Sequence, residues 1–297
     1  IIHAIHMEPN TAQKRFWSGS GGENWAKDRD IFDRRLQSLG GAAVQAMNLK
    51  AGMDVVDIGC GSGTTTFDIG TVVGNTGSVT GVDISVPMLR LAHERTKKYE
   101  LTNVRFLNQD IQTDSLNDNS FDAAFSRFGV MFFDEPVKAF VNLHRALRRS
   151  GQLAFVCFQS PERNLWASLS QKTIEKHLDI KMFEDKRAPS PFAFQEKKYI
   201  FQVLEEAGFS RIVIEGLEKN IDWYSGISVA QAVDNFFRTS PAAAEKLAVA
   251  DAASQVLIRT ELEAAYTDYY RDESITFPVA VWIVSVSYTH LTLPTKA

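Results

Sequence analysis

The chain has 297 residues, 44% of them hydrophobic, and 32 Lys and Arg against 36 Asp and Glu give a formal net charge of −4. This length and apolar content suit one large α/β domain with additions, or two domains with sizeable cores. The chain is slightly acidic, and its basic residues cluster no further than pairs such as Lys97-Lys98. Both features argue against a nucleic-acid partner.

Two cysteines and the absence of long apolar runs bear on the compartment. Cys60 stands inside a glycine-rich turn and Cys157 inside an apolar run, and neither position suits a disulfide. No apolar run reaches the ~18 residues that a membrane helix requires, and no signal peptide is visible. We therefore expect a cytoplasmic protein without stable membrane insertion.

The N-terminal residues precede the first patterned segment. The chain opens with six residues before Met7, which is the expected start, and we interpret residues 1–10 as a leader. His3 and His6 therefore predict no metal site. Residues 11–50 are expected to form an N-terminal helical cap, with a long helix over residues 29–47.

A buried strand followed by a glycine-rich turn is the most informative segment. The run from Val55 to Gly63 contains Asp57 and three glycines at positions 59, 61 and 63. Glycines allow the backbone to approach a ligand at the carboxyl end of a strand. Thr64 occupies the place where a dinucleotide fingerprint has its last glycine, which disfavours a nicotinamide enzyme.

Further strands follow at intervals of one βα unit. The run over residues 78–82 ends in Asp83, whose carboxylate can accept ribose hydroxyls in either a nicotinamide or another nucleoside cofactor. Strands are expected over residues 104–107, 121–126 and 153–158, and helices over residues 64–73, 86–99 and 135–148. His144 falls on the apolar face of the last helix, which favours a core role over a general base.

The C-terminal third is expected to hold two more strands with helices between them. Strands are predicted over residues 211–216 and 279–284, and residues 217–278 are predicted to be helical, with helices starting at Ser228, Pro241 and Asp251. Residues 286–297 resemble the translation of a transposon-based sequencing adapter, so we interpret them as an artefact.

These motifs in this order resemble the class I S-adenosylmethionine (SAM) methyltransferases. The D-x-G-x-G-x-G pattern resembles their motif I. The segments 16–25, 126–133 and 190–194 are similar to a bacterial group related to ubiquinone/menaquinone C-methyltransferases, and the likeness spans residues 10–285. It implies a Rossmann-like α/β fold, a seven-stranded mixed sheet with strand 7 antiparallel and helices on both faces. The domain would span residues 51–285, with helical lid insertions at about 160–209 and 217–278.

The resemblance also implies the cofactor, SAM, and the residues that bind it. Asp110-Ile111 would hold the adenine. In the turn before the fifth strand, Arg149 and Ser150 replace the family's proline and first glycine, and we expect the positive φ at Gly151. The full expected set for the cofactor is Asp57, Gly59, Cys60, Gly61, Gly63, Asp83, Ile84, Met88, Asp110, Ile111 and Ser126.

No catalytic residue is identified from the sequence, and no general base. The candidates for the methyl-transfer site follow the fourth strand: Ser126, Arg127, Phe128 and Met131. Arg127 could bind an anionic acceptor or the cofactor carboxylate, or form a structural ion pair. Most aromatic residues of the insertions are expected in the core, and the remainder would suit an apolar acceptor. They are Phe183, Phe192, Phe194, Tyr199, Trp223, Tyr224, Phe236, Phe237, Tyr266, Tyr269 and Tyr270.

The expected function is methyl transfer to a small organic acceptor, with the resemblance pointing to a quinone-like or aromatic ring carbon. An O- or N-methyltransferase of a natural product is the alternative. Two other classes stay open: an NAD(P)-dependent oxidoreductase and a SAM-binding protein without catalysis. A nucleic-acid methyltransferase would carry a D/N-P-P-Y/F/W or Pro-Cys signature, and residues 126–129 carry neither. The sequence predicts no oligomeric state.

Overall fold

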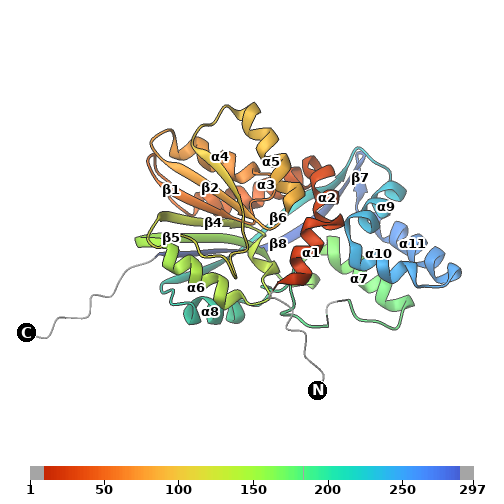
Figure 1. Ribbon diagram of the computed structural model, residues 1–297. Coiled ribbons are helices and arrows are strands. Elements are labelled where there is room, and N and C mark those ends of the chain that lie inside the picture. The colour runs from red at the N-terminus through yellow and green to blue at the C-terminus, as the bar shows by residue number, and fades with distance from the viewer. Residues whose placement is uncertain (1–9, 183, 288–297) are drawn as a thin grey trace, which may run out of the picture.

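A mixed β-sheet with helices on both faces forms the larger part of the molecule (Figure 1). The computed structural model describes residues 10–182 and 184–287. The strand order is β3-β2-β1-β4-β5-β8-β6, and a short β7 pairs with β8. The strands are β1 Asp54–Ile58, β2 Ser78–Asp83, β3 Val104–Asn108, β4 Phe121–Arg127, β5 Leu147–Phe158, β6 Ile212–Ser225, β7 Tyr270–Arg271 and β8 Ser274–Ser287.

The parallel strands put the glycine-rich turn at a topological switch point. β1 pairs in parallel with β2 on one side and with β4 on the other. Val55, Val56 and Ile58 are buried, as expected for a parallel strand covered by helices on both faces. Because chain connections leave β1 and β4 in opposite directions, their carboxyl ends border a crevice where ligands bind in such sheets.

Helices cover the two faces of the sheet as the expected βα alternation requires. α3 (Arg29–Gln45), α4 (Thr64–Val73) and α5 (Val86–Tyr99) lie on one face, and α6 (Pro136–Ala146) and α8 (Lys197–Glu206) on the other (Figure 1). Ser85 caps α5 by accepting a hydrogen bond from the Met88 main chain, and Pro87 follows in the first turn. The ring of His144 packs edge-on against Phe209, consistent with a packing role.

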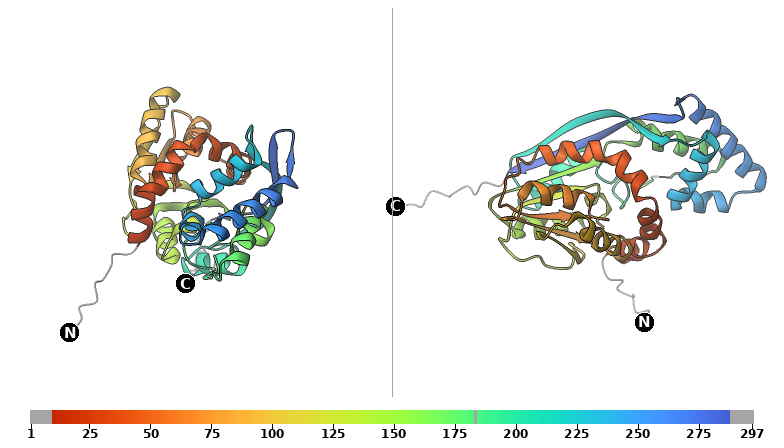
Figure 2. Two further views of the ribbon diagram at one scale, coloured as in Figure 1. Left: turned by 90° about the vertical axis from the view of Figure 1, so that its right-hand side faces the viewer. Right: turned by 90° about the horizontal axis from the view of Figure 1, so that it is seen from above.

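The last strand is antiparallel, as expected, but it and β6 are far longer than the predicted strands. β6 and β8 pair from Ile212 with Val286 to Ser225 with Ser274, as a ribbon that runs beyond the sheet (Figure 2). The prediction that residues 217–278 are helical from their start is therefore wrong for both ends of that segment. Alternate residues of the extension are buried, such as Ile275 and Phe277, so the apolar residues of this segment have the period of two that is typical of a strand.

A group of helices lies at the far end of this ribbon (Figure 2). α11 packs against both α7 and α9. Ser228 caps α9 with a complete capping box, and Asp251 caps α11 through the Ser254 main chain. The group consists of α7 Leu165–His177, α9 Val229–Thr239, α10 Pro241–Ala248 and α11 Ala252–Thr267.

The N-terminal helices lie between the sheet and this helical group. α1 (Thr11–Ser18) and α2 (Ser20–Lys27) precede α3, and α2 contacts both α5 and α9. Of the leader predicted over residues 1–10, only Asn10 is among the described residues. At the other end Val286 and Ser287 continue β8, and the rest of the segment interpreted as adapter lies outside the described residues.

The expected turn before the fifth strand is instead an irregularity inside β5, where the register with β4 shifts between Leu147 and Gln152. The positive φ, 67°, belongs to Ser150, and Gly151 is not in the left-handed region. A Cβ at Gly151 would lie 2.9 Å from the carbonyl oxygen of Arg148. A side chain at Gly151 would therefore collide with the main chain, while Ser150 carries the strained left-handed conformation.

Candidate functional site

The glycine-rich turn after β1 has a backbone that favours glycine at each of its three positions. Gly59, Gly61 and Gly63 have φ of 64°, 54° and 80°, all in the left-handed region. A Cβ at Gly59 would lie 2.8 Å from the Cα of Gly129, which follows β4. The turn therefore brings the main chains after β1 and β4 into contact, and three of its five residues carry no side chain.

Asp57 presents a carboxylate oxygen that lacks a partner beneath this turn. Its Oδ2 accepts a hydrogen bond from Thr66 Oγ1 at 2.7 Å, whereas Oδ1 is buried and has no partner within the described residues. Burial raises the pKa of Asp57 to about 7, although the Thr66 hydrogen bond and the charge of Arg127 act in the opposite direction. A cationic donor beside Oδ1 would satisfy this oxygen.

Asp83, at the end of β2, holds the turn as well as facing the crevice. Its Oδ2 accepts the Gly61 N–H at 2.7 Å and its Oδ1 accepts the Ser85 N–H at 2.8 Å. Burial raises the pKa of Asp83, and these main-chain hydrogen bonds counteract it. Each carboxylate oxygen has a second lone pair, so the carboxylate can still accept ribose hydroxyls.

Asp110, the residue expected at the adenine, is engaged by the N-terminal segment. Its Oδ2 lies 3.1 Å from Asn10 Nδ2 and 3.1 Å from Lys14 Nζ, and its Oδ1 accepts the Gln112 N–H. Ser18 Oγ also donates to the carbonyl oxygen of Ile84 at 2.9 Å. α1 therefore closes over the end of the crevice formed by β2 and β3.

The apolar residues expected around the cofactor lie in different parts of the structure. Met88 and Ile111 are both buried, and Met88 lies beside the turn, because a Cβ at Gly61 would lie 3.0 Å from Met88 Cε. The side chain of Cys60 packs in a separate apolar cluster, with Phe67, Leu89, Ala92 and Phe106. The main-chain N–H of Cys60 donates to the Val82 carbonyl oxygen at 3.2 Å, and its carbonyl oxygen accepts the Gly63 N–H at 3.0 Å, so its main chain holds the turn. Burial raises the pKa of its thiol well above the usual value.

The four candidates at the end of β4 and in the loop that follows it serve different structural roles. Ser126 is fully buried, where its Oγ donates to the Ile58 carbonyl oxygen at 2.8 Å and accepts the Gly129 N–H at 3.2 Å. Phe128 has a φ of 61°. Met131 is buried in the main core. Ser126 is thus a positioning residue for the loop that follows β4.

Arg127 is held by Asp33, an acid of α3 that no sequence motif marks. Its Nη2 lies 2.8 Å from Asp33 Oδ1, and Asp33 Oδ2 accepts the Thr64 hydroxyl at 2.6 Å. Arg95 Nη1 donates to the carbonyl oxygen of Ser62 at 2.7 Å. The structural ion pair proposed as one role of Arg127 is therefore present. Asp33 carries no local sequence signal, because an acid on an amphipathic helix normally marks a solvated face.

Four aromatic rings connect the end of β4 to the helical group, and we call them the aromatic series. Phe128 stacks on Phe158 with centroids 4.4 Å apart, Phe158 lies 5.1 Å from Trp166, and Trp166 stacks on Trp223 at 4.8 Å. Most other aromatics of the insertions are core residues, as expected, whereas Tyr199, Tyr269 and Tyr270 are only partly buried; Phe183 lies outside the described residues. The series borders the carboxyl edge of the sheet on the side away from β2.

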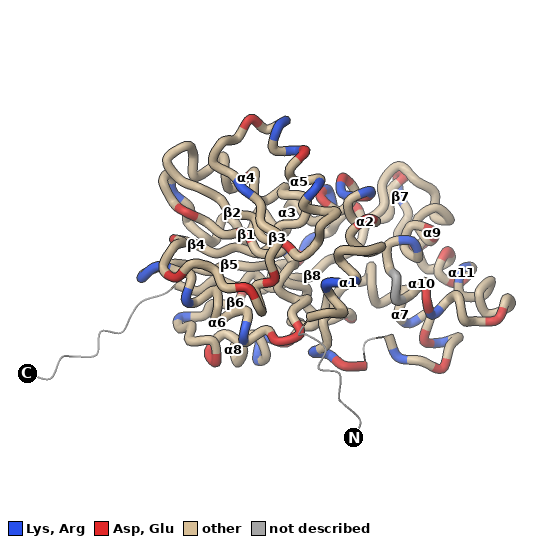
Figure 3. Tube along the Cα trace, in the orientation of Figure 1, with Lys and Arg blue, Asp and Glu red and all other residues tan. Residues whose placement is uncertain are grey.

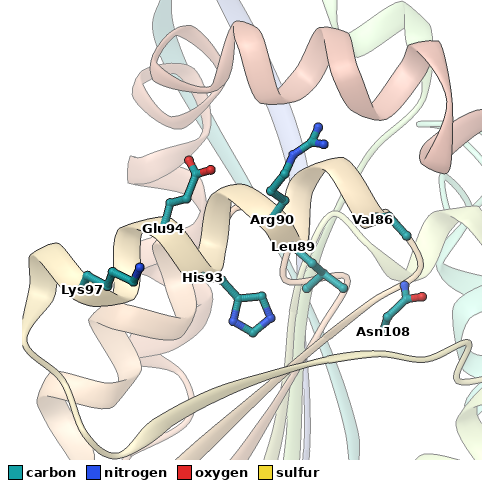
Figure 4. Close-up of a pocket in the computed structure, with 7 residues that line it drawn as sticks. All are labelled: Val86, Leu89, Arg90, His93, Glu94, Lys97 and Asn108. Carbon is teal, nitrogen blue, oxygen red and sulfur yellow. The ribbon is translucent and has the colours of Figure 1, made fainter.

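A separate hollow of about 490 Å³ lies on the outer face of α5 (Figure 4). It is lined by Val86, Leu89, Arg90, His93, Glu94, Lys97 and Asn108. None of these is an expected site residue. Asn108 nevertheless touches the crevice indirectly, because its Nδ2 donates to the carbonyl oxygen of Asp83 at 2.9 Å.

Charged residues of both signs are scattered over the described trace (Figure 3). Residues 106–126 are an exception, because they carry four acids and no base. No described helix is long and apolar enough to cross a membrane. Within residues 10–182 and 184–287, no group of three His, Cys, Asp or Glu side chains is arranged to hold a metal ion.

The comparisons with known proteins agree on one family. A family model described as a methyltransferase domain matches residues 49–208. Demethylmenaquinone methyltransferases from Staphylococcus epidermidis and Staphylococcus haemolyticus are each 27% identical, over 58% and 57% of this chain and 73% of the relative. A crystal structure of a methyltransferase from Bacillus halodurans aligns with a TM-score of 0.55 at 17% identity, covering 85% of this chain and 99% of that one. A phosphoethanolamine N-methyltransferase from Haemonchus contortus, solved with SAM, aligns with a TM-score of 0.57 at 18% identity, covering 93% of this chain and 60% of that one.

Proposed function

The chain belongs to the methyltransferase-domain family and is a class I SAM-dependent methyltransferase similar to quinone methyltransferases; on that premise we propose that its acceptor is a small quinol-like molecule, methylated on a ring carbon. The observation that carries the proposal is the aromatic series beside the end of β4. Its stacked rings supply a planar, apolar border for an acceptor ring.

The residues around the glycine turn fit the cofactor. When bound, SAM supplies an electrophilic methyl group on a sulfonium, together with an ammonium group and a nucleoside. The unpartnered Oδ1 of Asp57 suits the ammonium, and the bare turn allows close approach of the chain. Asp83 suits the ribose hydroxyls, and Asp110 suits the adenine amino group once Asn10 and Lys14 release it.

The remaining work of the protein is positioning and exclusion of water. A carbon acceptor would form its new bond as the methyl–sulfur bond breaks and its electron pair stays on sulfur, and the ring proton would then pass to a base or to water. Alignment of acceptor and methyl group contributes most to such a transfer. The Asp33–Arg127 pair fixes the loop after β4, and α1 covers the end of the crevice formed by β2 and β3.

A labelled-methyl assay tests the acceptor class. The full chain is incubated with carbon-13 methyl-labelled SAM and, separately, a naphthoquinol, a phenol and a primary amine, and the products are examined by NMR. We expect a label on a ring carbon of the naphthoquinol. A label found only on oxygen or nitrogen would contradict the proposed acceptor. The variant Arg34→Met, which changes an exposed position of α3 outside the site, should retain the full activity of the unmodified chain.

A further inference from the structure

Arg35 in α3 is a buried cation without an acidic partner. The residue is 3% exposed, and its guanidinium donates to the carbonyl oxygen of Trp223 and, at 3.4 Å, to Asn235 Oδ1. Among the described residues it forms no ion pair, because the nearby Asp28 pairs with Arg238. A guanidinium has five N–H donors, so donors remain for another acceptor.

Aromatic rings around Arg35 supply only part of the stabilisation that its buried positive charge needs. The Arg35 Cζ lies 4.6 Å from the ring centroid of Tyr224, 5.1 Å from that of Trp223 and 5.7 Å from that of Phe32. A ring face attracts a cation through its quadrupole, but it carries no net charge. Burial lowers the pKa of Arg35 to about 10, so the side chain remains positively charged at neutral pH without a counter-ion.

The position of Arg35 connects this cation to the crevice. Asp33, two residues earlier in α3, binds Arg127 at the end of β4. Trp223, whose carbonyl oxygen receives the Arg35 hydrogen bond, is the last ring of the aromatic series that begins at Phe128. The buried cation therefore lies at one end of the aromatic border, and the loop after β4 lies at the other.

We propose that Arg35 is a specificity-determining residue that binds the anionic oxygen of a planar aromatic acceptor. The proposal deepens the proposed function and rests on it for the location of the acceptor. An ionised ring hydroxyl would supply the missing counter-charge and accept the unused N–H donors.

Binding of two matched probes tests this charge preference in the unmodified protein. The probes are a hydroxynaphthoquinone, which is anionic at neutral pH, and its neutral methyl ether, each titrated calorimetrically into the full chain saturated with S-adenosylhomocysteine. We expect the anion to bind at least about tenfold more tightly, the smaller effect of a charge-assisted hydrogen bond. Equal affinities would overturn the proposal.

Variants assign the preference to Arg35. Arg35→Met should remove the preference for the anion while leaving the affinity for S-adenosylhomocysteine unchanged, and Arg35→Lys should restore part of it. Arg34→Met, on the neighbouring exposed position, should behave as the unmodified chain. If Arg35→Met does not fold, the Arg35→Lys variant and the probe pair still decide the question. A purely structural role would weaken both probes equally, which would contradict the proposal. A chain that selects the anion through Arg35 yet methylates no quinol would instead overturn the proposed acceptor alone.

Discussion

Asp57→Asn separates the cost of a buried carboxylate from its use in binding. The pKa of Asp57 is raised to about 7 from 3.8, so the folded protein holds this proton more tightly than the unfolded chain does. Its contribution to stability is therefore greatest at low pH and is lost as pH rises from about 4 to 7. About three pKa units at 1.36 kcal/mol each correspond to about 4 kcal/mol.

The substitution should remove this pH dependence. At about pH 8 the variant avoids a charged buried carboxylate, but it buries an amide N–H₂ without an acceptor at the place of Oδ1, which costs about 1 to 3 kcal/mol. We expect the variant to be about 1 to 3 kcal/mol more stable than the unmodified chain at that pH. SAM affinity should nevertheless fall roughly tenfold or more, because the ammonium loses a charged partner.

Urea titrations between about pH 4 and 8, with calorimetric SAM titrations, measure both effects. Asp54→Asn is the matched control in the same strand. Burial alone would raise the pKa of Asp54, but hydrogen bonds from Ser78 and Arg148 lower it, so its stabilisation is present above its unfolded pKa and is lost at low pH. Asp54→Asn should therefore destabilise the chain at high pH. The reasoning is refuted if both variants shift stability in the same direction, or if Asp57→Asn binds SAM as tightly as the unmodified chain.

Gly59→Ala should destabilise the fold by about 1 to 3 kcal/mol or more in urea titrations and abolish SAM binding, because φ is 64° and the new Cβ would meet Gly129. The control Gly41→Ala, in α3 with open space around it, should stabilise the fold by about 0.5 to 1 kcal/mol. Equal effects of the two substitutions on stability would contradict the expected strain at Gly59. Ser150→Gly should raise the melting temperature by relieving a φ of 67°, and a lower value would show that the serine is needed there. Asn10→Ala and Lys14→Ala should speed SAM association a few-fold in stopped-flow fluorescence, because α1 then holds Asp110 less firmly. An unchanged rate would mean that α1 stays closed as the cofactor enters.

Local patterns predicted the parts of the fold that depend on neighbouring residues. The helices over residues 64–73 and 86–99 have the bounds expected from their glycine and Ser85 starts, because caps and apolar periodicity are local properties. The glycine turn was identified for the same reason. The long ribbon of β6 and β8 was not predicted, although apolar residues alternate around Ile275 and Phe277. A short period of two does not show which distant segment pairs with it, and these strands stabilise each other across about 60 residues.

The site residues that were missed depend on tertiary contacts. Asp33 and Arg35 lie on one helix and resemble solvent-facing charges in the sequence, yet one binds Arg127 and the other is buried. The contacts of Asp110 with Lys14 join residues far apart in the chain. Ser150 was passed over because a glycine stands beside it, and only the backbone shows which of the two adopts the positive φ.

A crystal structure of the full chain with S-adenosylhomocysteine and a naphthoquinol tests the account most directly. We expect the amino group of the cofactor product at Asp57 Oδ1 and its ribose at Asp83. The quinol ring should lie against the aromatic series, with one oxygen toward Arg35. A nucleoside bound elsewhere, for example in the hollow on the outer face of α5, would contradict the site described for this chain.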